Sequence, residues 1–208
     1  FTPIYQQNLL LEIVRRDFTI NSIVLNLRNF EIYDPLKGLK DLERNVLKLS
    51  SPDSLKEDPL RILRVFRFGA SGFKIDKRVF ESIRKNSQKL SEIKPERIHE
   101  EIYKILKNPF TSYIWKEMEA YNVLREIFPE LSEMKNIPWS EPHHENPLDH
   151  SITTLYVLEE LLYNIDKIFP SVKEELEKYF SEKLFSEFTK KETLKLASLL
   201  HDIGKSKT

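Results

Sequence analysis

The sequence has 208 residues, a hydrophobic content of 40% and equal numbers of basic and acidic residues, so its formal net charge is zero. This length and composition suffice for a folded protein with a buried core. The absence of cysteine excludes disulfides and thiolate metal sites. No apolar run is typical of a membrane span or a signal peptide, and a cytoplasmic protein is therefore the expectation.

Four glycines and long stretches of 3.6-residue apolar periodicity predict a mainly α-helical protein, with strand signals confined to the first fifty residues. The two strand candidates are residues 31–33 and 46–49. Gly72 fits the end of a helix. Helices are predicted near residues 55–70, 77–90, 95–107, 109–125, 147–164, 171–187 and 190–203.

Several helix starts carry capping signals. Ser54 and Glu57 have the spacing of a capping box, and Asn108-Pro109 and Asn146-Pro147 each place an N-cap residue directly before a proline. The segment from 129 to 147 contains four prolines and few periodic apolar residues. We therefore predict a linker at residues 131–147, between an N-terminal unit and a C-terminal helical one.

The zero net charge hides an uneven distribution along the chain. Residues 37–107 hold 18 Lys/Arg against 11 Asp/Glu, whereas residues 108–208 hold 12 Lys/Arg against 18 Asp/Glu. The middle block is the expected face for a polyanion such as a nucleic acid. Charged helices that only solvate themselves are the other interpretation.

Residues 57–68 (EDPLRILRVFRF) place Asp58, Arg61 and Arg64 three residues apart, close to one helical face. On a surface helix these side chains could simply form ion pairs. They could also read a nucleobase. Cytosine and adenine both show an amino donor beside an unprotonated ring nitrogen, whereas uracil and guanine present the opposite order. A carboxylate beside a guanidinium therefore accepts C and A and rejects U and G.

Upstream, residues 15–21 (RRDFTIN) concentrate two cations, a carboxylate and an amide before an apolar stretch. Arginine can bind a triphosphate through two parallel hydrogen bonds, Asp17 can accept from ribose hydroxyls, and Asn21 follows one helical turn later on the same side. The group could hold a nucleotide. It could equally be a capped helix with a local Asp–Arg pair.

Four short motifs follow one another at residues 15–21, 34–42 (DPLKGLKDL), 57–61 (EDPLR) and 96–98 (ERI). In order and spacing they resemble the motifs of class II tRNA nucleotidyltransferases, the CCA-adding enzymes, and of bacterial poly(A) polymerases. The resemblance implies that residues 1–50 are the C-terminal part of an α/β nucleotidyltransferase head. It implies that residues 51–130 form a helical neck that binds RNA and nucleotide.

The same resemblance assigns roles to single residues. Asp58 and Arg61 would read the base. Asp17 and Asn21 would contact the sugar, and Arg16 and Arg64 the phosphates. Residues 34–42 would form a flexible loop. The implied partners are ATP or CTP and tRNA, and the implied cofactor is Mg²⁺.

Nucleotidyl transfer in this family needs paired carboxylates in an Asp-x-Asp segment, because two divalent ions must hold the attacking hydroxyl and the α-phosphate. The sequence contains no such pair, and Glu12 is the one acid among its first fourteen residues. The sequence starts at Phe1, and we expect a piece truncated at both ends. On this expectation the chain binds a nucleotide weakly and transfers nothing, and the activity belongs to the intact protein or to a complementing chain.

His150 and, some fifty residues later, His201 and Asp202 each lie beside an apolar helical stretch. Imidazoles and a carboxylate are good ligands for a divalent metal, although most His-Asp pairs lie on surfaces. The run at 199–205 (LLHDIGK), with HSITT upstream, resembles the HD-type metal-dependent phosphohydrolases. This resemblance implies a metal site in a truncated HD domain at 148–208, without that family's later Asp ligand. His143 and His144 belong either to the same pocket or to the linker.

Three functions follow from these patterns. The leading one is a neck and HD-domain fragment of a tRNA nucleotidyltransferase. The alternative is an HD-type phosphohydrolase or phosphodiesterase whose N-terminal part is an RNA-binding platform. A non-catalytic RNA-binding module is the third.

Overall fold

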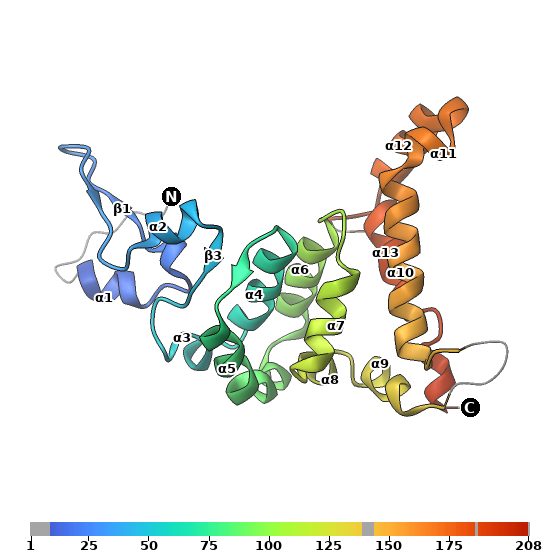
Figure 1. The fold of residues 1–208 in the computed structure, drawn as a ribbon, viewed down its shortest axis with the longest axis horizontal. Coiled ribbons are helices and arrows are strands. Elements are labelled where there is room, and N and C mark those ends of the chain that lie inside the picture. Colours follow the sequence, from blue (N-terminus) through green and yellow to red (C-terminus); the bar gives the residue numbers. More distant parts are fainter. Residues whose placement is uncertain (1–8, 139–143, 186, 208) are drawn as a thin grey trace. The chain divides into compact units, whose positions relative to one another are not determined.

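A computed structural model describes residues 9–138, 144–185 and 187–207, and the chain divides into two compact units, residues 1–93 and residues 94–208 (Figure 1). Helices dominate both units, which confirms the mainly helical fold class. The predicted neck, residues 51–130, includes the boundary between the units. Among the described helices, none combines the length and the apolar content that a membrane span needs.

The first unit combines short helices with two pairs of two-residue strands. Its elements in chain order are α1 (Leu9–Val14), η1 (Thr19–Asn21), β1 (Val24–Leu25), β2 (Ile32–Tyr33), α2 (Gly38–Glu43), β3 (Val46–Leu47), α3 (Ser54–Glu57), α4 (Arg61–Ala70), β4 (Lys74–Ile75), α5 (Lys77–Asn86) and η2 (Ser87–Glu92). Strand β1 pairs antiparallel with β2, and β3 pairs parallel with β4.

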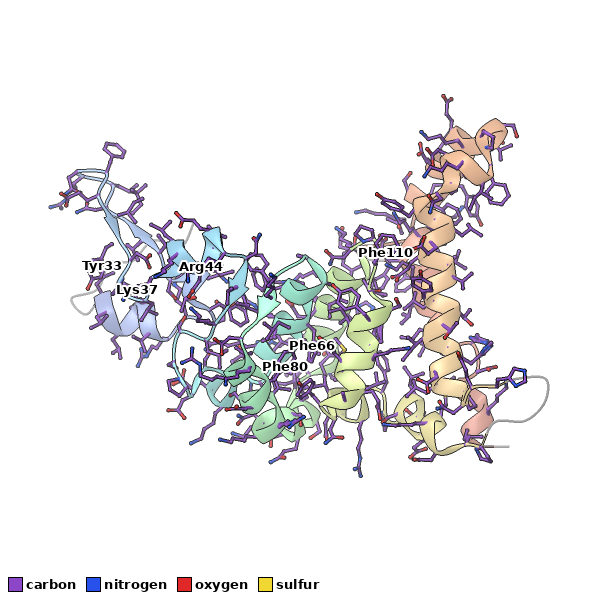
Figure 2. All side chains as sticks on the ribbon, in the orientation of Figure 1. Tyr33, Lys37, Arg44, Phe66, Phe80 and Phe110 are labelled. Carbon is purple, nitrogen blue, oxygen red and sulfur yellow. The ribbon has the colours of Figure 1, made fainter. Side chains whose placement is uncertain are left out.

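Helix α4 forms the core of the first unit because its apolar residues recur on one face. Ile62, Val65 and Phe66 are fully buried there, and Phe66 lies within the packed side chains (Figure 2). Phe18 is also fully buried and meets Phe68 edge to face at 5.3 Å between ring centroids. This packing holds the middle of the RRDFTIN segment against α4, and the half-buried Arg61 and Arg64 of α4 contact the same segment.

The second unit is helical, with one small hairpin. Its elements are α6 (Pro95–Leu106), α7 (Ser112–Ala120), α8 (Val123–Ile127), α9 (Pro129–Glu133), η3 (Met134–Asn136), α10 (Pro147–Tyr163), α11 (Ile165–Ile168), η4 (Pro170–Val172), α12 (Lys173–Ser181), β5 (Lys183–Phe185), β6 (Phe188–Thr189), α13 (Lys190–Leu200) and η5 (Ile203–Lys207). Strands β5 and β6 pair antiparallel.

A buried ion pair joins three parts of the second unit. Lys195 of α13 and Glu159 of α10 are both almost completely inaccessible, with 2.7 Å between Nζ and Oε1. Glu159 accepts hydrogen bonds from the backbone N–H groups of Thr111 and Ser112, at the start of α7. Lys195 donates to the carbonyls of Leu106 and Asn108, at the end of α6. The pair therefore satisfies both helix ends at the turn between α6 and α7.

Several predicted helices differ from the observed ones. The helix predicted at 55–70 is two helices, because Pro59 interrupts the backbone hydrogen bonding. The one predicted at 109–125 breaks at Asn122, which adopts a left-handed conformation with φ of 59°. The one predicted at 171–187 ends at Ser181 and is followed by the hairpin. The prediction that strands occur only in the first fifty residues was wrong, since β4, β5 and β6 lie beyond them.

The capping predictions have mixed outcomes. Asn146 caps α10 by accepting from the Asp149 N–H, as predicted. Ser54 is the first residue of α3 rather than its N-cap, which is Asp53, and its hydroxyl donates to the Asp17 carbonyl and accepts from Arg61. Asn108 does not begin α7, and its side chain donates to the last carbonyls of α6. The predicted linker begins inside helix α9 (Pro129–Glu133), at Leu131, which is fully buried. Its residues 139–143, including His143, lie outside the described residues.

Candidate nucleotide-binding and metal sites

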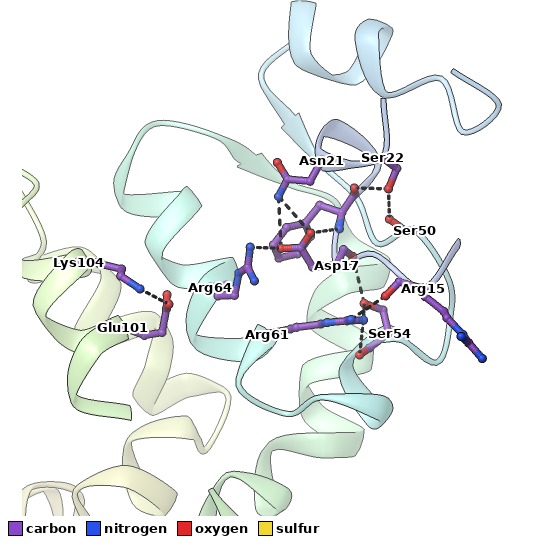
Figure 3. Close-up of polar contacts among 11 residues, drawn as sticks. Arg15, Asp17, Asn21, Ser22, Ser50, Ser54, Arg61, Arg64, Glu101 and Lys104 are labelled. Atoms are coloured by element: carbon purple, nitrogen blue, oxygen red, sulfur yellow. Dashed lines mark hydrogen bonds and ion pairs between the residues drawn. The ribbon is translucent and has the colours of Figure 1, made fainter. Parts of the chain in front are cut away.

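A buried carboxylate forms the centre of the candidate nucleotide site in the first unit (Figure 3). Asp17 is 5% exposed and accepts hydrogen bonds from the Phe18 N–H at 2.9 Å and from Asn21 Nδ2 at 3.1 and 3.3 Å. Arg64 Nη2 forms an ion pair with its Oδ2 at 2.5 Å. The turn η1 explains the contact with Asn21, because it folds this side chain back over Asp17. A carboxylate buried to this degree needs such partners.

Arg61 holds the same segment from helix α4. Its Nη2 donates to the Arg15 carbonyl at 2.7 Å, and its Nη1 donates to the Ser54 carbonyl at 3.2 Å and to the Ser54 hydroxyl at 2.9 Å (Figure 3). The Arg61 guanidinium therefore joins the Arg15 segment, 46 residues earlier, to the neighbouring helix α3. The predicted ion-pair interpretation does not describe Arg61, since these partners are not carboxylates.

Asp58 lies outside the helix that carries Arg61. It follows the last residue of α3 in an extended conformation, and its Oδ1 accepts from the Leu60 N–H at 3.2 Å. The expectation that Asp58 continues the helical face of Arg61 and Arg64 was therefore wrong. Helix α4 begins at Arg61, which leaves Arg61 and Arg64 on α4 and Asp58 one turn before it.

Arg16 completes the predicted nucleotide-binding set. It is half-buried, and among the described residues its guanidinium has no hydrogen bond or ion pair. This cation is consequently available for an anionic group such as a phosphate.

The structure also shows polar contacts that sequence reasoning missed. Thr19 donates to Asp41 Oδ2 at 2.9 Å, and Lys48 forms an ion pair with the same carboxylate. Gly38 packs so closely on this turn that an added Cβ would lie 2.1 Å from the Thr19 carbonyl oxygen. Asp34 closes the loop by accepting from the Gly38 and Leu39 N–H groups. The segment at 34–42, whose residues from Gly38 onward belong to helix α2, is thus anchored to the RRDFTIN segment. The glycine in that loop was the sequence signal for such a close approach.

A separate group in the second unit matches the predicted metal ligands. His150 of α10, together with His201 and Asp202 after α13, offers ligand atoms that all lie within 4.8 Å of one another. His201 Nδ1 donates to the Ser198 carbonyl at 2.8 Å, which leaves Nε2 as the ligating atom. A shared ion with bonds of ~2.1 Å requires ligand atoms within roughly 4 Å. The three residues are therefore a candidate group for a divalent metal, and their ligand atoms would have to move closer together to share one ion.

The charges around His150, His201 and Asp202 favour the ionised form of the Asp202 carboxylate. Burial by itself would raise the pKa of Asp202, but the Lys205 ammonium and the nearby His201 and His150 outweigh it, so the pKa lies below its ordinary value. Lys205 Nζ lies 2.7 Å from Asp202 Oδ2, the place that a cation would take. His144, the other candidate for this pocket, is exposed.

Within the first unit, acidic side chains lie among the cations of the basic block. A pocket with a volume of about 590 Å³ is lined by the cations Lys48, Lys56, Arg78 and Lys85. The carboxylates Asp53, Asp76 and Glu81 line it as well. Arg78 pairs with Asp76 at 3.1 Å. Arg78, Arg84 and Lys85 are nevertheless exposed, as an RNA contact requires.

Comparisons with known proteins place these motifs in a family context. A family described as "Poly A polymerase head domain" matches residues 3–48, and one described as "Probable RNA and SrmB- binding site of polymerase A" matches residues 72–135. The multifunctional CCA protein of Tolumonas auensis is 33% identical over 95% of the chain, and the A-adding tRNA nucleotidyltransferase of Deinococcus radiodurans is 28% identical over 100%. The chain spans 43% of the length of each relative.

Solved structures agree with these sequence matches. A tRNA nucleotidyltransferase complexed with a primer tRNA and an incoming ATP analog is 26% identical, with a TM-score of 0.68 over 96% of this chain and 52% of that one. A tRNA-processing enzyme with CTP is also 26% identical, with a TM-score of 0.66 over 95% of this chain and 49% of that one.

Proposed function

Because the chain belongs to the class II tRNA nucleotidyltransferase and poly(A) polymerase family, we propose that it is the part of such an enzyme that selects the incoming nucleotide and binds tRNA. The main support is the arrangement in the first unit. Asp17 contacts Asn21 and Arg64, and Arg61 donates a hydrogen bond to the backbone of the RRDFTIN segment that carries Asp17. The matched family at 72–135, described as an RNA-binding site, supports the RNA partner.

In this proposal Asp58 and Arg61 recognise the base edge that ATP and CTP share. Arg61 has five N–H donors, of which the contacts with Ser54 and Arg15 use only part, so donors remain for a ring nitrogen. One template that accepts C and A serves the addition of CC, of A, of CCA or of a poly(A) tail.

The remaining residues hold the sugar and the phosphates. Asn21 donates its amide to Asp17, and its Oδ1 is then directed away and can accept from a ribose hydroxyl. Asp17 is largely saturated, so we assign it chiefly to orienting Asn21 and Arg64. Arg16 and Arg64 supply the positive charge for the triphosphate.

Transfer itself belongs to the whole enzyme. The family uses divalent metal ions, for which we propose Mg²⁺, held by carboxylates that are not among the residues of this sequence. The 208-residue chain should therefore bind a nucleotide weakly and transfer none. We place the enzyme in the cytoplasm, where its tRNA substrate is processed.

Nucleotide titrations of the chain followed by NMR test the base-reading role. The wild-type chain should prefer ATP and CTP to UTP and GTP, and Asp58→Ala should reduce that preference. Asp53→Ala is the matched control, because Asp53 is a neighbouring exposed carboxylate with no side-chain capping bond. An Asp58→Ala chain that discriminates as well as the control would refute the template.

A second candidate function rests on the convergence of His150, His201 and Asp202. We propose that they hold a divalent metal in an HD-type site that hydrolyses a phosphate ester. After dialysis against Mn²⁺ or Zn²⁺, the chain should retain metal, and His201→Ala should lose it while His144→Ala keeps it. Equal metal content in both variants would eliminate the site, and hydrolysis of bis(p-nitrophenyl) phosphate would separate a catalytic site from a structural one.

A further inference from the structure

Ser54 occupies the point where the segments of the candidate nucleotide site meet. It is fully buried at the first position of α3, and its hydroxyl donates to the Asp17 carbonyl at 3.1 Å. The same hydroxyl accepts from Arg61 Nη1 at 2.9 Å (Figure 3). One oxygen atom thus connects the segment that carries Asp17 with the guanidinium of α4.

The hydrogen bonds of the Ser54 hydroxyl determine the orientation of the Arg61 guanidinium. Its Nη1 is directed toward Ser54 and its Nη2 toward the Arg15 carbonyl, so the plane of the guanidinium is fixed by two segments at once. A planar donor group fixed in this way presents its remaining N–H groups in one direction. An arginine that could rotate freely would offer donors to any of the four bases.

We infer that Ser54 is a positioning residue for Arg61, and that its hydroxyl sets the discrimination of ATP and CTP from UTP and GTP. The inference rests on the proposed function, in which Arg61 reads the base. Neither the sequence motifs nor the relatives' names point to this serine, whose spacing from Glu57 predicts a helix cap.

Removing the hydroxyl should loosen Arg61 without unfolding the unit. In Ser54→Ala the Asp17 carbonyl keeps the hydrogen bond from the Ser50 N–H at 3.1 Å. Arg61 keeps the Ser54 and Arg15 carbonyls but loses the shorter of its two Nη1 contacts. Since a hydrogen bond to a charged group is stronger than a neutral one, the preference for ATP and CTP should fall roughly three- to tenfold.

The matched control is Ser22→Ala. Ser22 is 1% exposed, and its hydroxyl bonds with the Phe18 carbonyl and the Ser50 hydroxyl, but it does not touch Arg61. Both variants lose a buried hydroxyl from the same unit. Only a positioning role predicts that they differ in nucleotide preference.

The experiment titrates the 208-residue chain and its variants with ATP, CTP, UTP and GTP, and it follows the Arg61 guanidinium signals by ¹⁵N NMR. We expect Ser54→Ala to lower the preference and to speed exchange of the Arg61 guanidinium protons, and Ser22→Ala to do neither. In an Arg61→Ala background, Ser54→Ala should have no further effect on preference, because Ser54 acts through Arg61.

Two results would overturn the inference and are distinguishable. If the wild-type chain prefers ATP and CTP but Ser54→Ala keeps that preference, Ser54 is only structural and the proposed function stands. If the wild-type chain shows no preference among the four nucleotides, base reading by this chain fails, and the role of Ser54 fails with it.

Discussion

Replacing Lys195 by methionine should strongly destabilise the second unit. Lys195 and Glu159 are buried together, and the change leaves the Glu159 carboxylate without its counter-charge and the Leu106 and Asn108 carbonyls without their donor. Removing one partner of a buried ion pair costs roughly 3–5 kcal/mol. We expect about 3 kcal/mol, the lower limit, because Glu159 keeps the N–H groups of Thr111 and Ser112.

Burial makes this ion pair sensitive to the loss of either partner. Burial lowers the pKa of Lys195, and the Glu159 carboxylate offsets only part of that shift. The charged ammonium is therefore held in place by its partners rather than by solvent. In the double variant Lys195→Met/Glu159→Gln no charge remains, and the loss should be smaller than the sum of the two single losses by at least about 1 kcal/mol.

Urea unfolding followed by the fluorescence of the buried Trp115 measures these free energies. Lys191→Met is the control, since this lysine lies one turn earlier on α13 and has no ion pair or hydrogen bond through its ammonium among the described residues. It should change the free energy of unfolding by under about 0.5 kcal/mol. A Lys195→Met loss below about 1 kcal/mol, or strictly additive variants, would refute the idea that the pair holds the α6–α7 turn.

Three further predictions concern other contacts. Gly38→Ala should destabilise the first unit by roughly 1–3 kcal/mol in urea, because its Cβ would meet the Thr19 carbonyl oxygen at 2.1 Å, whereas Gly204→Ala meets nothing within 4 Å and should be silent. Burial raises the pKa of Glu117 above its ordinary 4.5, so the folded state holds this proton more tightly than the unfolded chain. The stability of the second unit should therefore fall as pH rises from 4.5 through the raised pKa, and Glu117→Gln should flatten that fall in urea titrations at several pH values. For tRNA, the logarithm of the binding constant measured by filter binding should fall with the logarithm of salt concentration with a slope near −3 to −4, if about four phosphates are contacted. Reversing the charges of Arg78, Arg84 and Lys85 should make this slope less steep. An unchanged slope would place the RNA contact elsewhere. Charge reversal is a cleaner test than deleting residues 148–208, because that deletion also removes Glu159 and Lys195 from the α6–α7 turn.

Local chemistry made several features predictable from the sequence alone. The 3.6-residue period identified most helices, and the Asn146-Pro147 pair identified the start of α10, because both signals depend on hydrogen bonds within a few residues. The four-residue spacing of Asp17 and Asn21 placed them on the same side, whereas the hydrogen bond between them appeared only in the structure. The order of the motifs identified the family, since motif spacing does not depend on knowing the fold.

Only the tertiary structure decided how distant segments share atoms. Ser54 has the spacing of a helix cap, yet its hydroxyl donates to the Asp17 carbonyl, 37 residues away, and accepts from Arg61. Lys195 looks like any surface lysine of an amphipathic helix, yet packing of α13 buries it against a turn more than eighty residues earlier. Where the sequence predicts the end of a helix, residues 183–185 and 188–189 instead form strands β5 and β6, which pair with each other. Sequence periodicity describes which face a residue occupies, whereas long-range hydrogen bonds depend on which segment the fold brings to that face.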